Sequence, residues 1–269
     1  MTRQWLSSLR RAGLLQAAEA RGGARGLPAA WWRLALVGLA GGGVLAPAAL
    51  ASSLPAARGL PAERPGPAGG PRLLADLSGA AWAGWEHTTH LPWEARNVYT
   101  RLDTPEGPVV RVDSQAAASM LLRHVTLEVA REPVVSWRWR IAAPMRGSDE
   151  SDRSRDDCAA RVYFLWGLRT RADLLSATGL GYVWGRTRRV GAMGPSPFTG
   201  RVGVFTLRSG APGAGAWQTE RRDLDADYRA FFRQAPPGPV TAVVLLTDTD
   251  QTQGRATAWY GPIWAEARR

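Results

Sequence analysis

The sequence contains no lysine, a single cysteine and three histidines among its 269 residues. Because Cys158 is the only cysteine, an internal disulfide is excluded and the fold must be held together by its core. All 34 basic residues are arginine, a usage that, with many alanines, glycines and tryptophans, is typical of a GC-rich bacterial genome. Common catalytic motifs are also missing. No G-x-S-x-G elbow occurs, so the sequence does not indicate a serine hydrolase.

Much of the positive charge lies at the N-terminus. Residues 1–51 contain six arginines and one glutamate, so the rest of the chain has 28 arginines against 22 acidic residues, and the net charge falls from +11 to about +6. This excess is mild and the arginines are scattered. We therefore predict no nucleic-acid partner.

Residues 34–51 form an uncharged run that ends in Ala49-Leu50-Ala51, the small-x-small pattern of a signal-peptidase site. The run is short and rich in glycine, which disfavours a membrane span. We predict a cleaved signal peptide at residues 1–51, with cleavage near Ala51, rather than an uncleaved anchor. The mature protein would then be periplasmic or secreted, with no stable membrane span.

Residues 52–71 are rich in proline, glycine and alanine and have few large apolar side chains, which predicts a flexible leader. The remaining residues, 72–269, are predicted to form a single domain.

Within this domain, bulky apolar and polar residues alternate with the period of a half-buried strand. In residues 136–141 and 161–166 the pattern predicts a core formed by Trp137, Trp139, Ile141, Val162, Phe164 and Trp166. One helix is predicted, at residues 225–232, with Asp225 as its cap. The predicted strands lie near residues 97–103, 109–114, 123–129, 134–141, 159–166, 181–184, 201–207, 216–222, 240–247 and 256–265. This succession, with no regular alternation of helices, predicts an all-β fold: a two-sheet β-sandwich resembling a jelly roll, with one short helix.

Four motifs in order resemble a bacterial family known as domain of unknown function 3047. They are Ser136-Trp137-Arg138-Trp139-Arg140, Arg155-Asp156-Asp157 with Arg161-Val162-Tyr163, Gly181-Tyr182-Val183-Trp184, and Leu245-Leu246-Thr247-Asp248-Thr249-Asp250. The resemblance implies an exported bacterial β-sandwich. It carries over no catalytic residue, because the family has no established activity.

The polar positions of the alternating strands suggest a ligand-binding face. If the strands are neighbours, one sheet presents a stripe made of Arg138, Arg140, Arg161, Tyr163, Arg111 and Asp113. Arginine binds carboxylates bidentately, and tyrosine adds a flat surface with a hydroxyl. The stripe therefore predicts either a groove for an anionic or polyhydroxyl ligand or a solvated face of cross-strand ion pairs.

Two loops carry closely spaced aspartates: Asp156 and Asp157 before one strand, and Asp248 and Asp250 after another. Calcium prefers such oxygen ligands, so Ca²⁺ is a candidate cofactor; the alternative is that these side chains cap turns. No other cofactor is predicted.

The leading hypothesis is a non-catalytic, exported β-sandwich that binds an envelope or extracellular glycan, with an acidic glycan as one option. One alternative is a carbohydrate-active hydrolase or lyase on the same fold, with carboxylates drawn from Asp113, Asp157 and Asp248. Another is a structural or protein-interaction module of the envelope. The sequence makes no prediction of oligomeric state.

Overall fold

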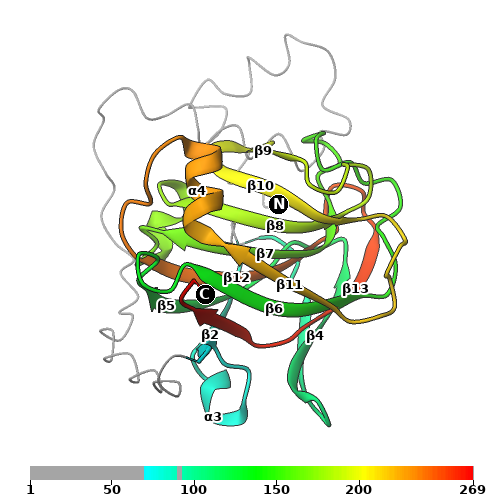
Figure 1. Cartoon of the computed structure of the whole chain (residues 1–269). Coiled ribbons are helices and arrows are strands. Elements are labelled where there is room, and N and C mark those ends of the chain that lie inside the picture. The colour runs from blue at the N-terminus through cyan, green and yellow to red at the C-terminus, as the bar shows by residue number, and fades with distance from the viewer. Residues whose placement is uncertain (1–69, 90–92, 269) are drawn as a thin grey trace, which may run out of the picture. The chain divides into compact units, whose positions relative to one another are not determined.

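A computed structural model describes residues 70–89 and 93–268 of the chain (Figure 1). The predicted signal peptide and nearly all of the predicted leader lie outside these residues. The described part forms two facing sheets of seven strands each, so the predicted two-sheet β-sandwich is confirmed. No helix in residues 70–89 and 93–268 is long and apolar enough to cross a membrane.

The first sheet, here called sheet A, is antiparallel throughout. Its strands run in the order β1 (Arg72–Ala75), β14 (Ile263–Glu266), β6 (Val134–Ile141), β13 (Arg255–Tyr260), β4 (Gly107–Gln115) and β3 (Val98–Thr104), and β11 (Gln218–Asp223) pairs with the free side of β6. β13 and β14 follow each other as one interrupted strand in the middle of the sheet. They pair with β6 on one side and with β4 and β1 on the other.

The second sheet, sheet B, has the strand order β2 (Trp85–Thr88), β5 (Met120–Leu127), β12 (Val240–Asp248), β7 (Cys158–Trp166), β8 (Thr178–Gly185), β10 (Thr199–Ser209) and β9 (Met193–Ser196). Its neighbours are antiparallel except β8 and β10, which are parallel. Short helices complete the described chain: α3 (Gly79–Trp82), the 3₁₀ helix η2 (Arg171–Leu175) and α4 (Leu224–Phe232).

The core lies between the sheets and is aromatic. The six side chains predicted from the alternating pattern are each at most 2 % exposed, so that prediction is confirmed. Trp137 and Trp139 of β6 meet edge to face with ring centres 5.7 Å apart, and Trp139 also packs against Trp184 of β8. The buried indole N–H of Trp139 donates to Glu220 at 3.0 Å, which satisfies its one polar group.

Three local features differ from the prediction. The strand expected at residues 256–265 is divided into β13 and β14 by Gly261-Pro262, because proline has no N–H to donate to the ladder. The cap of α4 is Asp223, whose carboxylate accepts the N–H of Ala226; Asp225 instead pairs with Arg229. The strands β1, β2 and β9 were not predicted, since each has only four residues.

Candidate functional site

Four of the six predicted ligand-binding residues share the outer face of sheet A. Arg138 and Arg140 alternate along β6 with buried tryptophans, and Arg111 and Asp113 alternate along β4 with buried valines and Ser114. The two strands lie on either side of β13. The strand period therefore directs all four side chains away from the core.

Two tryptophans interleave with these arginines. Trp259 of β13 lies opposite Arg140 on one neighbouring strand and opposite Arg111 on the other. Trp217 directly precedes β11, whose residue Gln218 pairs with Trp139, so it lies beside Arg140. We call this line of side chains, Trp217, Arg140, Trp259 and Arg111, the Arg–Trp row. It crosses the sheet from β11 to β4.

Arg140 is held between two indoles. Its guanidinium carbon lies 4.0 Å from the ring centre of Trp259 and 5.3 Å from that of Trp217. Its Nε is buried without a hydrogen-bond partner, and no ion pair among residues 70–89 and 93–268 involves it. Aromatic packing therefore fixes the orientation of this positive charge, which no carboxylate of the described residues pairs with.

The other arginines of this face differ in how their charge is balanced. The guanidinium carbon of Arg138 lies 4.6 Å from the ring centre of Trp217, and the guanidinium donates to the carbonyl oxygen of Glu106. Arg138 likewise forms no ion pair in the described chain. Arg111 pairs with Asp113 at 2.9 Å. The predicted alternative of a face made of cross-strand ion pairs therefore does not describe Arg138 or Arg140.

Arg161 and Tyr163 do not belong to this face, and the prediction of one stripe for all six residues was wrong. Both lie on β7, which is in sheet B and pairs with β8 and β12. Arg161 is only 5 % exposed and binds both carboxylate oxygens of Asp156, at 3.0 and 3.1 Å. Removing either partner of such a buried pair costs about 3–5 kcal/mol, and Asp156 occupies the terminal nitrogens that a ligand would need.

The predicted aspartates of the two loops meet at the end of sheet B. Asp157, Asp248 and Asp250 each place a carboxylate oxygen within 4.8 Å of the others. We call these three residues the aspartate cluster. The fourth predicted residue, Asp156, is not in the cluster, because Arg161 holds it.

Asp157 fastens the loop that follows β12. One of its oxygens accepts the N–H of Gln251 at 3.0 Å, and the other accepts both the N–H and the hydroxyl of Thr252. Asp248 is 4 % exposed and its Oδ1 has no hydrogen-bond partner. Burial raises the pKa of Asp248 well above its usual range; Arg161 opposes this rise, and Asp250 and Asp157 add to it.

A β-bulge positions this cluster. Leu246 pairs with Arg161 but Asp248 pairs with Cys158, so β7 has one extra residue between the two pairs. Tyr260, from sheet A, reaches the bulge: its hydroxyl donates to the carbonyl oxygen of Leu246 at 2.7 Å and accepts the N–H of Arg161. The aspartates converge next to this bulge, where β7 and β12 pair.

Of the carboxylates considered for hydrolysis, Asp157 and Asp248 come together, whereas Asp113 lies on the other sheet. Asp157 is fully buried and both of its oxygens accept hydrogen bonds. A fully buried carboxylate cannot reach a glycosidic bond, so the arrangement does not support the pairing that hydrolysis requires.

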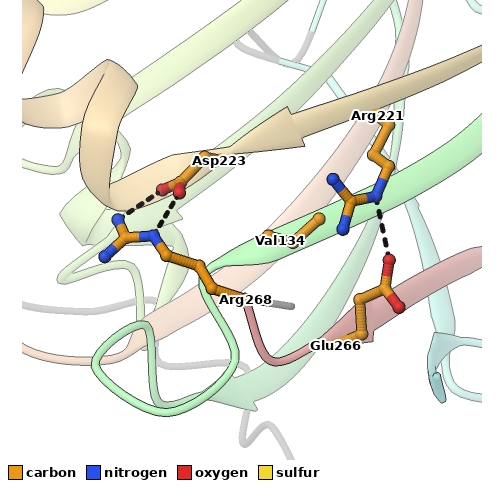
Figure 2. Close-up of a pocket in the computed structure, with 5 residues that line it drawn as sticks. All are labelled: Val134, Arg221, Asp223, Glu266 and Arg268. Carbon is orange, nitrogen blue, oxygen red and sulfur yellow. Dashed lines mark hydrogen bonds and ion pairs between the residues drawn. The ribbon is translucent and has the colours of Figure 1, made fainter. Parts of the chain in front are cut away.

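A pocket of about 460 Å³ lies elsewhere, where β6, β11 and β14 meet (Figure 2). None of the predicted site residues lines it. Figure 2 shows its two arginines turned toward carboxylates: Arg221 pairs with Glu266 at 2.9 Å, and Arg268 binds Asp223. These charges are neutralised within the pocket, unlike that of Arg140.

Sequence reasoning missed the two tryptophans of the Arg–Trp row. The signal for Trp259 was present: Thr257 and Trp259 alternate with the buried residues Ala258 and Tyr260, which predicts an outward indole. Trp217 falls within the strand predicted at residues 216–222, but β11 begins at Gln218 and its residues 218–222 are all polar, so no apolar alternation shows which way the indole points.

Comparison with known families supports the resemblance found in the sequence. Residues 83–264 match the family described as "Protein of unknown function (DUF3047)". The chain belongs to the DUF3047 family. No curated protein sequence matches it.

Several solved structures resemble this DUF3047 protein distantly. The xyloglucanase domain of NopAA from Sinorhizobium fredii, in complex with cellobiose, is 10 % identical with a TM-score of 0.39, over 68 % of this chain and 93 % of that one. A cellulase derived from Cel12A of Rhodothermus marinus is 12 % identical with a TM-score of 0.39, over 73 % and 96 %. A family 11 xylanase from Neocallimastix patriciarum is 7 % identical with a TM-score of 0.37, over 68 % and 90 %. Similarity at this level assigns no role to any residue of this chain.

Proposed function

We propose that this DUF3047 protein is an exported, non-catalytic β-sandwich that binds an acidic glycan on the outer face of sheet A. Arg140 carries the proposal. Its guanidinium lies between the indoles of Trp217 and Trp259, with no carboxylate of the described chain paired with it. Export rests on the predicted signal peptide at residues 1–51.

The chemistry of this face suits an anionic ligand. A guanidinium presents planar, forked donors that match a carboxylate or sulfate group, and the flanking indoles hold that plane in place before the ligand arrives. Less side-chain entropy is then lost on binding.

The spacing of the cations favours a polymer. Arg138 and Arg140 are two residues apart on β6 and point to the same face of the sheet. Their Cα atoms are therefore roughly 7 Å apart. Neither has an ionic partner in the described chain. Two such cations suit a glycan with repeated acidic groups better than a single small anion.

The test is binding of the full-length chain to polygalacturonate, measured by isothermal titration calorimetry, with neutral cellohexaose as the comparison. Arg140→Ala should weaken binding at least about ten-fold, since a hydrogen bond to a charged group contributes about 1.5–3 kcal/mol. Arg201→Ala removes an exposed arginine from β10 of sheet B and should leave the affinity unchanged.

Two results would overturn the proposal. One is equal binding of polygalacturonate and cellohexaose. The other is an unchanged affinity of Arg140→Ala. If that variant unfolds, as circular dichroism would show, Arg138→Ala provides the same test on a side chain that packs against only one indole of the row.

A further inference from the structure

We propose that Asp157, Asp248 and Asp250 bind a calcium ion at the end of sheet B. This inference goes beyond glycan binding and does not depend on it, because the aspartate cluster and the Arg–Trp row lie on different sheets.

The first observation is that three carboxylates lie close together. The three carboxylates come from two segments far apart in the sequence: Asp157 precedes β7, and Asp248 and Asp250 end β12 and begin the following loop. Their oxygens nevertheless lie within 4.8 Å of one another. Calcium binds oxygens at 2.3–2.6 Å, so two ligands on opposite sides of the ion are up to about 5 Å apart. A single ion can therefore contact all three.

The second observation concerns Asp248 itself. Its side chain is 4 % exposed, yet Oδ1 accepts no hydrogen bond. Buried polar atoms in native proteins nearly always have a partner, and an unpaired carboxylate oxygen is among the costliest to leave alone. A cation between the three carboxylates supplies that partner.

Arg161, the positively charged side chain next to the cluster, is bound to Asp156. Arg161 uses both terminal nitrogens of its guanidinium on Asp156, and one of them also donates to the hydroxyl of Tyr163. No hydrogen bond joins Arg161 to the aspartate cluster in the described chain. Asp157 and Asp248 therefore share this small volume without a hydrogen bond to Arg161.

The loop after β12 is fixed in place beside the aspartate cluster. Asp157 binds the backbone N–H groups of Gln251 and Thr252, which holds the loop against the start of β7. The side-chain oxygen of Gln251 is buried without a partner and is a candidate fourth ligand. Calcium completes its six to eight ligands with carbonyl oxygens and water. The bound ion would fasten β7, β12 and this loop together, so it would act on stability.

The experiment measures thermal unfolding of the full-length chain by calorimetry in EGTA, in 10 mM calcium chloride and in 10 mM magnesium chloride. For a dissociation constant near 10⁻⁴ M, calcium should raise Tm by roughly 5–10 °C. Magnesium should give less than half of that rise, because it requires a tighter octahedral site. Titration calorimetry should give one calcium ion per chain.

Asp248→Asn removes one ligand charge without changing side-chain size. This variant should stay folded in EGTA and should lose the rise in Tm with calcium. Asp103→Asn, at an exposed aspartate of β3, is the matched control and should keep the full rise. If Asp248→Asn does not fold, Asp250→Asn gives the same readout.

The proposal fails if calcium changes neither Tm nor the calorimetric heat of the wild-type chain. It also fails if magnesium produces an equal rise in Tm, or if Asp248→Asn responds to calcium as the wild type does.

Discussion

Burial raises the pKa of the Cys158 thiol to about 12, from its usual value of 9.0. The thiol is 1 % exposed and donates to the carbonyl oxygen of Trp184 on the neighbouring strand. Between pH 9 and 12 the unfolded chain has released this proton while the folded chain retains it. The stability that depends on this protonated thiol is therefore present below pH 9 and is lost as the pH rises toward 12.

At pH 10 the thiol should cost about 1.4 kcal/mol of unfolding free energy relative to pH 8. Urea unfolding at the two pH values, for the wild type and for Cys158→Ala, measures this difference. Tyrosine titration affects both proteins equally and cancels in the comparison. Parallel losses of stability in the two proteins would contradict the prediction.

At the scale of elements, helix α4 docks on a glycine. Gly203 of β10 faces the ring of Phe231, and a Cβ placed there would lie 2.6 Å from a ring carbon. Gly203→Ala should destabilise the fold by about 1–3 kcal/mol, because the helix must move away. Gly200→Ala, on the same strand with open space around it, should be neutral or slightly stabilising.

Urea midpoints of the two alanine variants decide this prediction. Equal midpoints would show that α4 tolerates the extra methyl group and that its docking is looser than the structure indicates.

The elements differ in how well the sequence predicts them. Long strands with one apolar face, such as β6 and β7, follow directly from their alternation. Strands of four residues carry too few side chains to show a period, so β1, β2 and β9 were missed. The helix was found, but its cap was misplaced by two residues, since Asp223 and Asp225 are equally good caps in sequence.

At the scale of the whole molecule, Tyr260 joins the two sheets. It belongs to β13 of sheet A, and its buried hydroxyl satisfies two backbone groups at the bulge of sheet B. Tyr260→Phe removes both hydrogen bonds and should cost about 1–3 kcal/mol of unfolding free energy.

The control for this prediction is Tyr228→Phe. The hydroxyl of Tyr228 makes one long contact, 3.4 Å, with Thr178. Its loss should cost less than about 1 kcal/mol in the same urea titration. A smaller loss for Tyr260→Phe than for Tyr228→Phe would show that the bulge does not depend on the tyrosine.

The candidate sites also show what sequence can predict at this scale. Alternation correctly assigned Arg138 and Arg140 to an outer face, but it does not say which strands become neighbours. Arg161 was therefore grouped with them, although β7 lies in the other sheet. The meeting of Asp157 with Asp248 depends on the pairing of β7 with β12 and on a bulge, and neither leaves a periodic signal.

The position of β13 and β14 in the middle of sheet A affects the order in which the chain can fold. These strands are the last described ones in the sequence, yet β6, β4 and β1 all pair with them. A growing chain therefore has no complete sheet A until residue 266 has left the ribosome. Sheet A is then completed late and joins distant segments, which slows folding. For a chain that is predicted to be exported, late completion of sheet A would favour passage through a translocation channel before the fold closes.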